Sequence, residues 1–269
     1  MKQIYLKKQT NNLLGIIMTA KHTVIESCFM NSDTRICTPA IILLFFIVFH
    51  SKYNKMMFNE IYAGPGDVFI QLLNNNNPLL YCGIMAFALV LLNDHPNISQ
   101  EMQFSLVRCG RKVWILGEML GIFFSGMITG IFLWLIGIIS NVQTIDWNHP
   151  MVTIRSIQAF FVFCLFFLMI GNLLMLCKLF QVQLQGIAIL GMLLFVDRGI
   201  VDLIPNMVTT FGMEEKLPIV LSWYNRLSPS NRLSGLCMGN DWKSVAIYFG
   251  FIALGLGVFL VFFVNRKDL

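Results

Sequence analysis

Residues 113–140 read VWILGEMLGIFFSGMITGIFLWLIGIIS, an apolar run in which Glu118 is the single formal charge. A transmembrane helix needs about 20 consecutive apolar residues to cross a hydrocarbon core about 30 Å thick. This run exceeds that length, so it can cross with some tilt. It therefore predicts a membrane-spanning helix and an integral membrane protein.

The composition of the whole chain agrees with this interpretation. Of the 269 residues, 57% are hydrophobic and 12% are charged, and the mean hydropathy is +0.71. Soluble domains carry about 25% charged residues, so a soluble fold could not bury this much apolar surface. The net charge of +5 comes from short basic clusters between apolar runs, a pattern that membrane insertion produces. We therefore expect the lipid bilayer, and not nucleic acid, as the partner of these charges.

Five further apolar runs complete the predicted topology. The pattern predicts an all-α, polytopic transmembrane helix bundle that forms a single domain, residues 1–269, with six spans. The predicted spans are residues 36–53, 78–93, 113–140, 157–177, 184–204 and 245–264. In the first span only residues 36–50 lack formal charge, so its length depends on Lys52 and Tyr53 at the membrane edge.

The distribution of basic residues predicts the orientation. Eleven of the 19 Lys and Arg residues lie in segments predicted to be inside, and seven lie in segments predicted to be outside. Because inner loops carry the excess of basic residues, both termini are expected in the cytoplasm and the chain in the cell membrane. Near the N-terminus, residues 11–35 place Leu14, Ile17 and Met18 on one side at helical spacing. This spacing predicts an amphipathic helix that lies in the membrane surface.

Catalytic signatures are lacking in this sequence. None of the four His is paired at metal-ligand spacing, and neither Gly-x-Ser-x-Gly nor Gly-x-x-x-x-Gly-Lys occurs. We therefore expect no enzyme activity, metal or cofactor in this chain, so ATP-driven work would need a separate subunit. The seven Cys contain no Cys-x-x-Cys pair and are predicted to be free, with Cys82 and Cys237 as the one candidate pair.

The most specific feature is the inner segment between the second and third predicted spans, residues 97–112. It contains most of the pattern Glu101-x-x-Phe104-x-x-x-Arg108-x-Gly110-Arg111-x-x-Trp114, whose last residue lies in the third predicted span. Ser99 can cap a short helix here, and Phe104 and Arg108, four residues apart, share one face of it. Two interpretations remain open: a rigid amphipathic knob presented to the cytoplasm, or an ordinary anchored loop that follows the positive-inside rule.

This pattern, together with the N-terminal helix and the long outer segment 205–242, resembles the permease subunits of type 2 ABC transporters, including the G-subfamily exporters. The resemblance implies that residues 97–112 form a coupling loop that docks on a separate ATPase subunit, which binds ATP and Mg. The implied contact residues are Glu101, Phe104, Arg108, Gly110 and Arg111. It also implies a second permease half, as a homodimer or a related heterodimer.

The same family carries an outer re-entrant helical hairpin before the last span, which would correspond to residues 205–242. The apolar run 217–223 followed by a turn-rich break fits such a hairpin. A plain amphipathic outer loop is the alternative.

The resemblance implies a permease subunit of the exporter class. The compact size and the Phe- and Met-rich spans suit a peptide, drug-like or lipid-like amphiphile as its cargo. An alternative from a different class is a non-transporting membrane anchor or sensor that binds a cytoplasmic partner through the inner loop. A third alternative, an intramembrane enzyme, would need polar residues that converge at mid-depth.

The fifth predicted span contains Asp197, Arg198 and Asp202. Ionisable residues at membrane depth cost a few kcal/mol each and usually face a bundle interior or a water-filled cavity. These three residues either line a translocation path or mark the water-exposed outer end of the span.

The third predicted span carries two small-residue motifs, Gly117-x-x-x-Gly121 and Gly126-x-x-x-Gly130. This spacing lets helix backbones approach closely in lipid. The sequence leaves open whether these glycines pack within the chain or against a second copy.

Overall fold

The computed structural model describes residues 12–21, 64–73, 110–142, 145–180, 203, 210, 217–236, 239 and 241–266. Within these residues the chain is helical and contains no β-strand, so the predicted all-α class is confirmed for them. The elements are an N-terminal helix (residues 12–21), α3 (Pro65–Leu72), α6 (Arg111–Ser140), α7 (Ile154–Leu179), α10 (Leu217–Leu227), α11 (Pro229–Ser234) and α12 (Trp242–Arg266).

Three of the described helices are long and apolar enough to cross a membrane. These segments are Arg111–Ile139 of α6, Ile154–Cys177 of α7 and Trp242–Val264 of α12. They coincide with the predicted spans 113–140, 157–177 and 245–264. The predicted spans 36–53, 78–93 and 184–204 lie outside the described residues, apart from Leu203. The three helices thus indicate a membrane-embedded protein.

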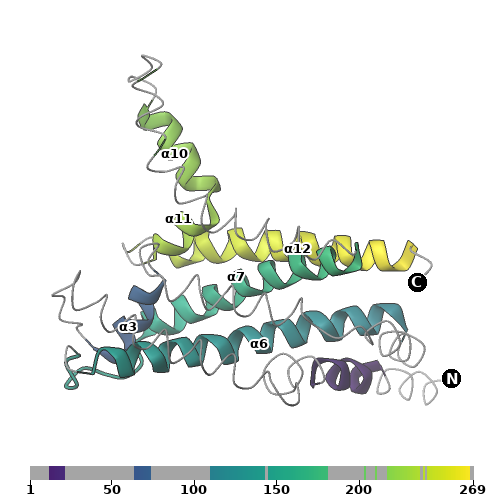
Figure 1. Cartoon of the computed structure of the whole chain (residues 1–269), viewed down its shortest axis with the longest axis horizontal. Coiled ribbons are helices and arrows are strands. Elements are labelled where there is room, and N and C mark those ends of the chain that lie inside the picture. The colour runs from purple at the N-terminus through teal and green to yellow at the C-terminus, as the bar shows by residue number, and fades with distance from the viewer. Residues whose placement is uncertain are drawn as a thin grey trace.

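Helix α7 lies between α6 and α12 and is the most buried of the three (Figure 1). Helix α6 runs antiparallel to α7 and to α12. We call the end of the bundle that holds Arg111, Leu179 and Val264 the inner end, following the predicted orientation. The opposite end, where α7 and α12 begin, is called the outer end.

The outer end is held together by aromatic packing around α3. Phe69 of α3 is 2% exposed, and its ring centroid lies 6.4 Å from that of Trp134, 5.4 Å from Phe160 and 5.9 Å from Phe163. Pro65 occupies the first turn of α3, where its missing N–H costs no hydrogen bond. Its carbonyl oxygen accepts a 2.8 Å hydrogen bond from Nε1 of Trp134. The stretch between the predicted spans 36–53 and 78–93 therefore contains a buried helix, α3.

Helix α7 begins with a reciprocal cap. The backbone N–H of Ser156 donates to Oγ1 of Thr153 at 3.1 Å, and the backbone N–H of Thr153 donates to Oγ of Ser156 at 2.8 Å. Each hydroxyl thus satisfies a backbone donor that the first helical turn leaves unpaired. The cap fixes the start of α7 beside α3.

Glycines of α6 bring its backbone close to the neighbouring helices of the same chain. A Cβ atom on Gly126 would lie 2.7 Å from Cδ1 of Phe167, and one on Gly130 would lie 2.8 Å from Cε2 of Phe160. A Cβ atom on Gly137 would lie 2.9 Å from Cγ1 of Val68 in α3. These close approaches are the use that small residues serve in membrane helices. The glycines of this face pack within the chain.

Helices α10 and α11 meet at Ser228 near the outer end. The Oγ of Ser228 accepts a 3.1 Å hydrogen bond from the backbone N–H of Asn231 and so caps α11. Leu233 of α11 is buried in the outer core, and α10 leads from this anchored end away from the three long helices (Figure 1). A re-entrant hairpin would run beside the spans. In the described part of the segment 205–242, the helices do not confirm it.

We expect Gly126→Ala to lower the free energy of unfolding by about 1–3 kcal/mol, because the new Cβ collides with the buried Phe167 ring. The matched control is Gly255→Ala in α12, where a Cβ would meet nothing within 4 Å. This control should be neutral or stabilised by up to about 1 kcal/mol through helix propensity. Thermal unfolding in detergent micelles compares the two variants, and equal midpoints would contradict the packing.

Candidate functional site

The inner end of the bundle is where the predicted coupling loop enters α6. Of that loop, the structure describes the last three residues, 110–112, whereas Glu101, Phe104 and Arg108 lie outside the described residues. Gly110 has a φ of 79°, a backbone conformation that other L-residues rarely adopt. A Cβ atom there would meet nothing within 4 Å, so the backbone and not the packing calls for glycine. Gly110 turns the chain into the first turn of α6.

Arg111 joins the start of α6 to the end of α12. Its Nη1 donates a 3.2 Å hydrogen bond to the carbonyl oxygen of Val264. The last four carbonyls of a helix have no partner within the helix, and a cation is favourable at this negative end of the macrodipole. Arg111 therefore satisfies the end of α12 with both a hydrogen bond and a charge.

A small apolar cluster lies beneath this contact. Trp114 of α6 is 7% exposed and packs among Leu176 and Leu179 of α7 and Leu260 of α12. The cluster therefore contains side chains from all three long helices. It gives Arg111 and Val264 a fixed relative position.

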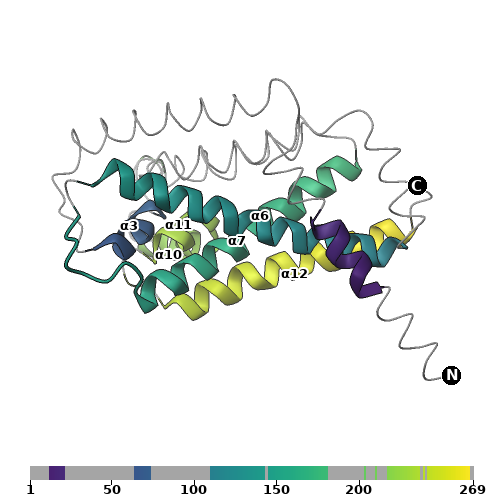
Figure 2. The same ribbon diagram turned by 90° about the horizontal axis from the view of Figure 1, so that it is seen from below.

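The N-terminal helix is seated on α6 at Gly117 and crosses the inner end of the bundle obliquely (Figure 2). A Cβ atom on Gly117 would lie 2.5 Å from Cβ of Thr19 and 3.0 Å from the carbonyl oxygen of Ile16. Thr19 is buried, and its hydroxyl donates to the carbonyl of Gly15 at 2.9 Å. Gly117, the first residue of the first glycine motif, therefore contacts the N-terminal helix of the same chain.

The opposite face of the N-terminal helix is apolar and exposed. Its side chains are Leu13, Leu14, Ile17 and Met18, each more than half exposed. They include the three residues, Leu14, Ile17 and Met18, that the sequence places on one side. The helix thus presents one face to α6 and an unpaired apolar face to its surroundings, as an interfacial helix does.

A buried amide, Asn172 of α7, is a polar contact that the sequence reading missed. Its Nδ2 donates a 3.0 Å hydrogen bond to the carbonyl oxygen of Ala253 in α12, and its side chain is fully buried. Among the described residues, its Oδ1 has no hydrogen-bond partner. Gly257 follows Ala253 by one turn and lies against α6, since a Cβ there would lie 2.4 Å from Cε of Met119 but at an ordinary contact distance of 3.7 Å from Nδ2 of Asn172. In the sequence, a single amide side chain within an apolar run is the feature that could have indicated this contact.

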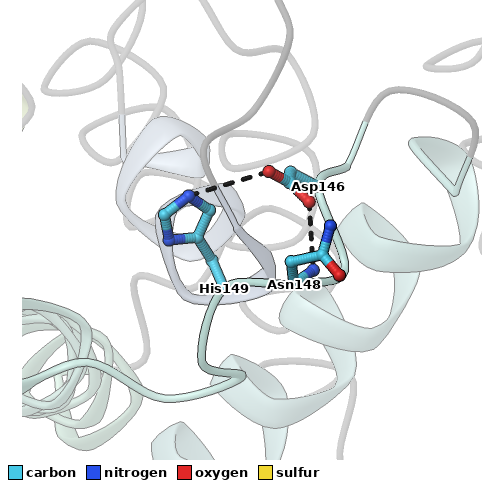
Figure 3. Close-up of polar contacts among 3 residues, drawn as sticks. All are labelled: Asp146, Asn148 and His149. Carbon is cyan, nitrogen blue, oxygen red and sulfur yellow. Dashed lines mark hydrogen bonds and ion pairs between the residues drawn. The ribbon is translucent and has the colours of Figure 1, made fainter.

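The outer loop between α6 and α7 contains the one described histidine. Nε2 of His149 lies 3.7 Å from Oδ2 of Asp146, and the Asp146 Oδ1 accepts a 3.0 Å hydrogen bond from the backbone N–H of Asn148 (Figure 3). The side chains of His149 and Asp146 are 58% and 41% exposed. This Asx-turn geometry organises the loop. Among the described residues, no group of His, Cys, Asp or Glu side chains could hold a metal ion.

A cavity of about 230 Å³ opens at the outer end between α3, α7 and α12. Its lining includes Arg155, Gln158, Asp241 and Trp242. Asp241 caps α12, since its Oδ1 accepts a 3.2 Å hydrogen bond from the backbone N–H of Lys243. The Asp241 carboxylate therefore stabilises the first turn of α12. The cavity lining contains a basic side chain, Arg155, and an acidic one, Asp241, which water or a small solute could contact.

The remaining predicted site residues receive no structural test. Asp197, Arg198 and Asp202 lie outside the described residues, as do Cys82 and Cys237. Gly121 is buried within α6. Glu118 is partly buried one turn after Trp114.

No family model, curated protein or solved structure matches this chain. The functional interpretation therefore depends on the residues of the chain and on the described geometry.

We expect Arg111→Ala to loosen the end of α12 because the hydrogen bond to Val264 and the favourable charge are both lost. The expected loss is about 1–2 kcal/mol, reduced from the value for a fully buried charged donor because this side chain is only partly buried. Hydrogen exchange of the last-turn amides of α12 should accelerate. Lys112→Ala, at the exposed neighbouring position, is the control and should leave these amides unchanged. Unchanged exchange in the Arg111 variant would show that the contact does not hold α12.

Asn172→Asp should destabilise the bundle by about 2–4 kcal/mol at neutral pH, since a carboxylate would be placed within a span and against a carbonyl oxygen. The same substitution at the exposed Asn148 is the control and should change stability little. Thermal unfolding in micelles measures both. A variant at 172 as stable as the control would mean that the site is hydrated.

Proposed function

We propose that this chain is the membrane-spanning permease subunit of an ATP-driven ABC transporter of the exporter class. The observation that carries the proposal is the hydrogen bond from Arg111 to Val264. It joins the residue at which the inner loop enters α6 to the last turn of α12. A force applied to the loop would therefore reach two spans at once.

The placement of the described segments supports a chain with six spans. The N-terminal helix lies at the inner end against Gly117, and α3 lies at the outer end against Gly137. Helix α6 begins at the inner end and α7 ends there, whereas α12 begins at the outer end. We therefore propose that each of the connections 22–63, 74–109 and 181–216 crosses once from one end of the bundle to the other. The proposed spans 36–53, 78–93 and 184–204 fall within these three connections.

The inner end would transmit movement of the loop 97–112 to the long helices. The loop 97–112 would contact an ATPase subunit through Glu101, Phe104 and Arg108, and Gly110 and Arg111 would pass its movement to the bundle. Closure of the nucleotide-binding subunits around ATP and Mg would then bias the bundle between two states.

The long helices also leave apolar surface for a second permease half. Phe251 and Val258 of α12 are 78% and 70% exposed, and Ile131 and Leu135 of α6 are exposed as well. In the proposed assembly, lipid covers part of this surface and an identical or related half covers the rest. An amphiphilic peptide, drug-like or lipid-like molecule is the proposed cargo, and the cell membrane, with both termini in the cytoplasm, is the proposed location.

The proposal predicts that a nucleotide-binding subunit co-purifies with the chain in mild detergent. The double variant Glu101→Ala, Arg108→Ala should lose this subunit, because it removes the charged contacts of the loop and leaves the described bundle intact. The control is Asp146→Ala, Lys243→Ala, which removes one charge of each sign at the outer end. It should retain the subunit.

Reconstitution in liposomes separates a transporter from a membrane anchor. The native complex should hydrolyse ATP faster in the presence of a transported amphiphile, and the loop variant should not. A chain that binds no nucleotide-binding subunit in any mild detergent would contradict the proposal. A complex that forms but shows no substrate-dependent turnover would favour the anchor or sensor.

A further inference from the structure

Helix α10 carries an apolar face that the described bundle leaves uncovered. Its side chains Ile219, Val220, Trp223 and Leu227 are 61%, 41%, 61% and 65% exposed. They follow one another at i, i+1, i+4 and i+8, so they share one side of the helix. Ser222 and Asn225 lie on other sides. Helix α10 is therefore amphipathic, with its apolar side exposed.

The C-terminal end of α10 is fixed at a defined level of α12. The hydroxyl of Tyr248 donates a hydrogen bond to the carbonyl oxygen of Leu227. The guanidinium of Arg232 in α11 lies 5.3 Å from the centroid of the Tyr248 ring, a cation–π contact. These two contacts anchor α10 and α11 to the outer part of α12.

This level corresponds to the edge of the hydrocarbon core. At a rise of 1.5 Å per residue, a core about 30 Å thick takes about 20 residues of helix. Counted from Val264, the last apolar residue of α12, the core ends near Val245, three residues before Tyr248. Side chains on a helix lean toward its N-terminus, here the outer side, so the Tyr248 hydroxyl reaches the boundary. Leu227 therefore lies where the acyl chains meet the headgroups.

The charges and the neighbouring surface also fit a bilayer. Residues 217–234 contain Arg226 and Arg232 and no acidic residue, so they suit phosphate headgroups. Helix α10 leaves the bundle on the side of α12 (Figure 1). Near this level α12 also exposes the apolar side chains of Ile247 and Phe251. Tryptophan is the residue that prefers the membrane interface, and Trp223 occupies the centre of the exposed face.

We propose that α10 is an interfacial helix that inserts its Ile219–Leu227 face into the outer leaflet, at the boundary between headgroups and acyl chains. A helix of this kind buries its apolar face about 5–10 Å into the boundary region. It would anchor the outer segment to the lipid beside the pathway. This inference depends on the membrane embedding of the chain and not on the proposed transport function.

Tryptophan fluorescence of the full chain in lipid vesicles tests the proposal. The difference between the emission of the native chain and that of Trp223→Phe isolates Trp223 among the five Trp residues. We expect this emission to be lost in vesicles of lipid brominated near the headgroup end of the acyl chains. Lipid brominated near the chain ends should quench it less, and aqueous iodide should quench it little.

Two controls define the iodide quenching expected of a water-exposed indole. Trp147, in the outer loop and 51% exposed, is isolated in the same way with Trp147→Phe and should be quenched by iodide. The double variant Ser222→Trp, Trp223→Phe moves the indole to another side of α10 and should restore access of iodide. Both controls keep the chain intact.

Three results would overturn the proposal. Quenching of Trp223 by iodide but not by brominated lipid would place α10 in water. Protection from both quenchers would place α10 against a protein partner or a second copy of the chain. Stronger quenching by the deep bromines than by the shallow ones would place it in the core, as a re-entrant helix would be.

Discussion

The contact between the glycines of α6 and the phenylalanines of α7 is the interaction on which the rest of the described bundle depends. In lipid, apolar side chains gain little by leaving their surroundings, because acyl chains are as apolar as they are, so close packing must supply much of the attraction between helices. Gly126 and Gly130 let the rings of Phe160 and Phe167 lie directly on the backbone of α6. With α7 fixed in this way, α12 packs on its other side through rings such as Phe249, which lies 5.1 Å from Phe166.

Both ends of this bundle combine apolar packing with a few polar contacts. At the outer end, Phe69 contacts three aromatic rings, and Trp134 donates a hydrogen bond to α3. At the inner end, the apolar cluster around Trp114 joins the three long helices, and the ring centroid of Phe180 lies 4.4 Å from that of Phe263. The hydrogen bond of Arg111 and the close approach at Gly117 add the last turn of α12 and the N-terminal helix to this packing. Both ends of the described bundle are therefore closely packed.

Polar groups in the described bundle mark the places where helices are joined with a fixed register. Asn172 links α7 to the carbonyl of Ala253, and Thr153 and Ser156 cap the start of α7. Such contacts are specific because an unpaired polar group in an apolar environment costs free energy. The Oδ1 atom of Asn172 is an exception, because among the described residues it has no hydrogen-bond partner. The Nδ2 atom of the same amide donates the hydrogen bond to Ala253 of α12.

Much of this architecture follows from the sequence through one-dimensional constraints. The length and high apolar content of residues 113–140, 157–177 and 245–264 favour helices, because a helix satisfies the backbone hydrogen bonds of such a run within the run itself. The apolar side of the N-terminal helix follows from helical periodicity. Tertiary structure alone determined which groups meet. Hydropathy assigned residues 53–78 to a connection, yet Phe69 is buried because the rings of α6 and α7 surround it. Likewise, the partners of Gly117, Arg111 and Asn172 lie far away in the chain, and a contact between distant segments is fixed by how helices pack in three dimensions and not by the periodicity of any one of them.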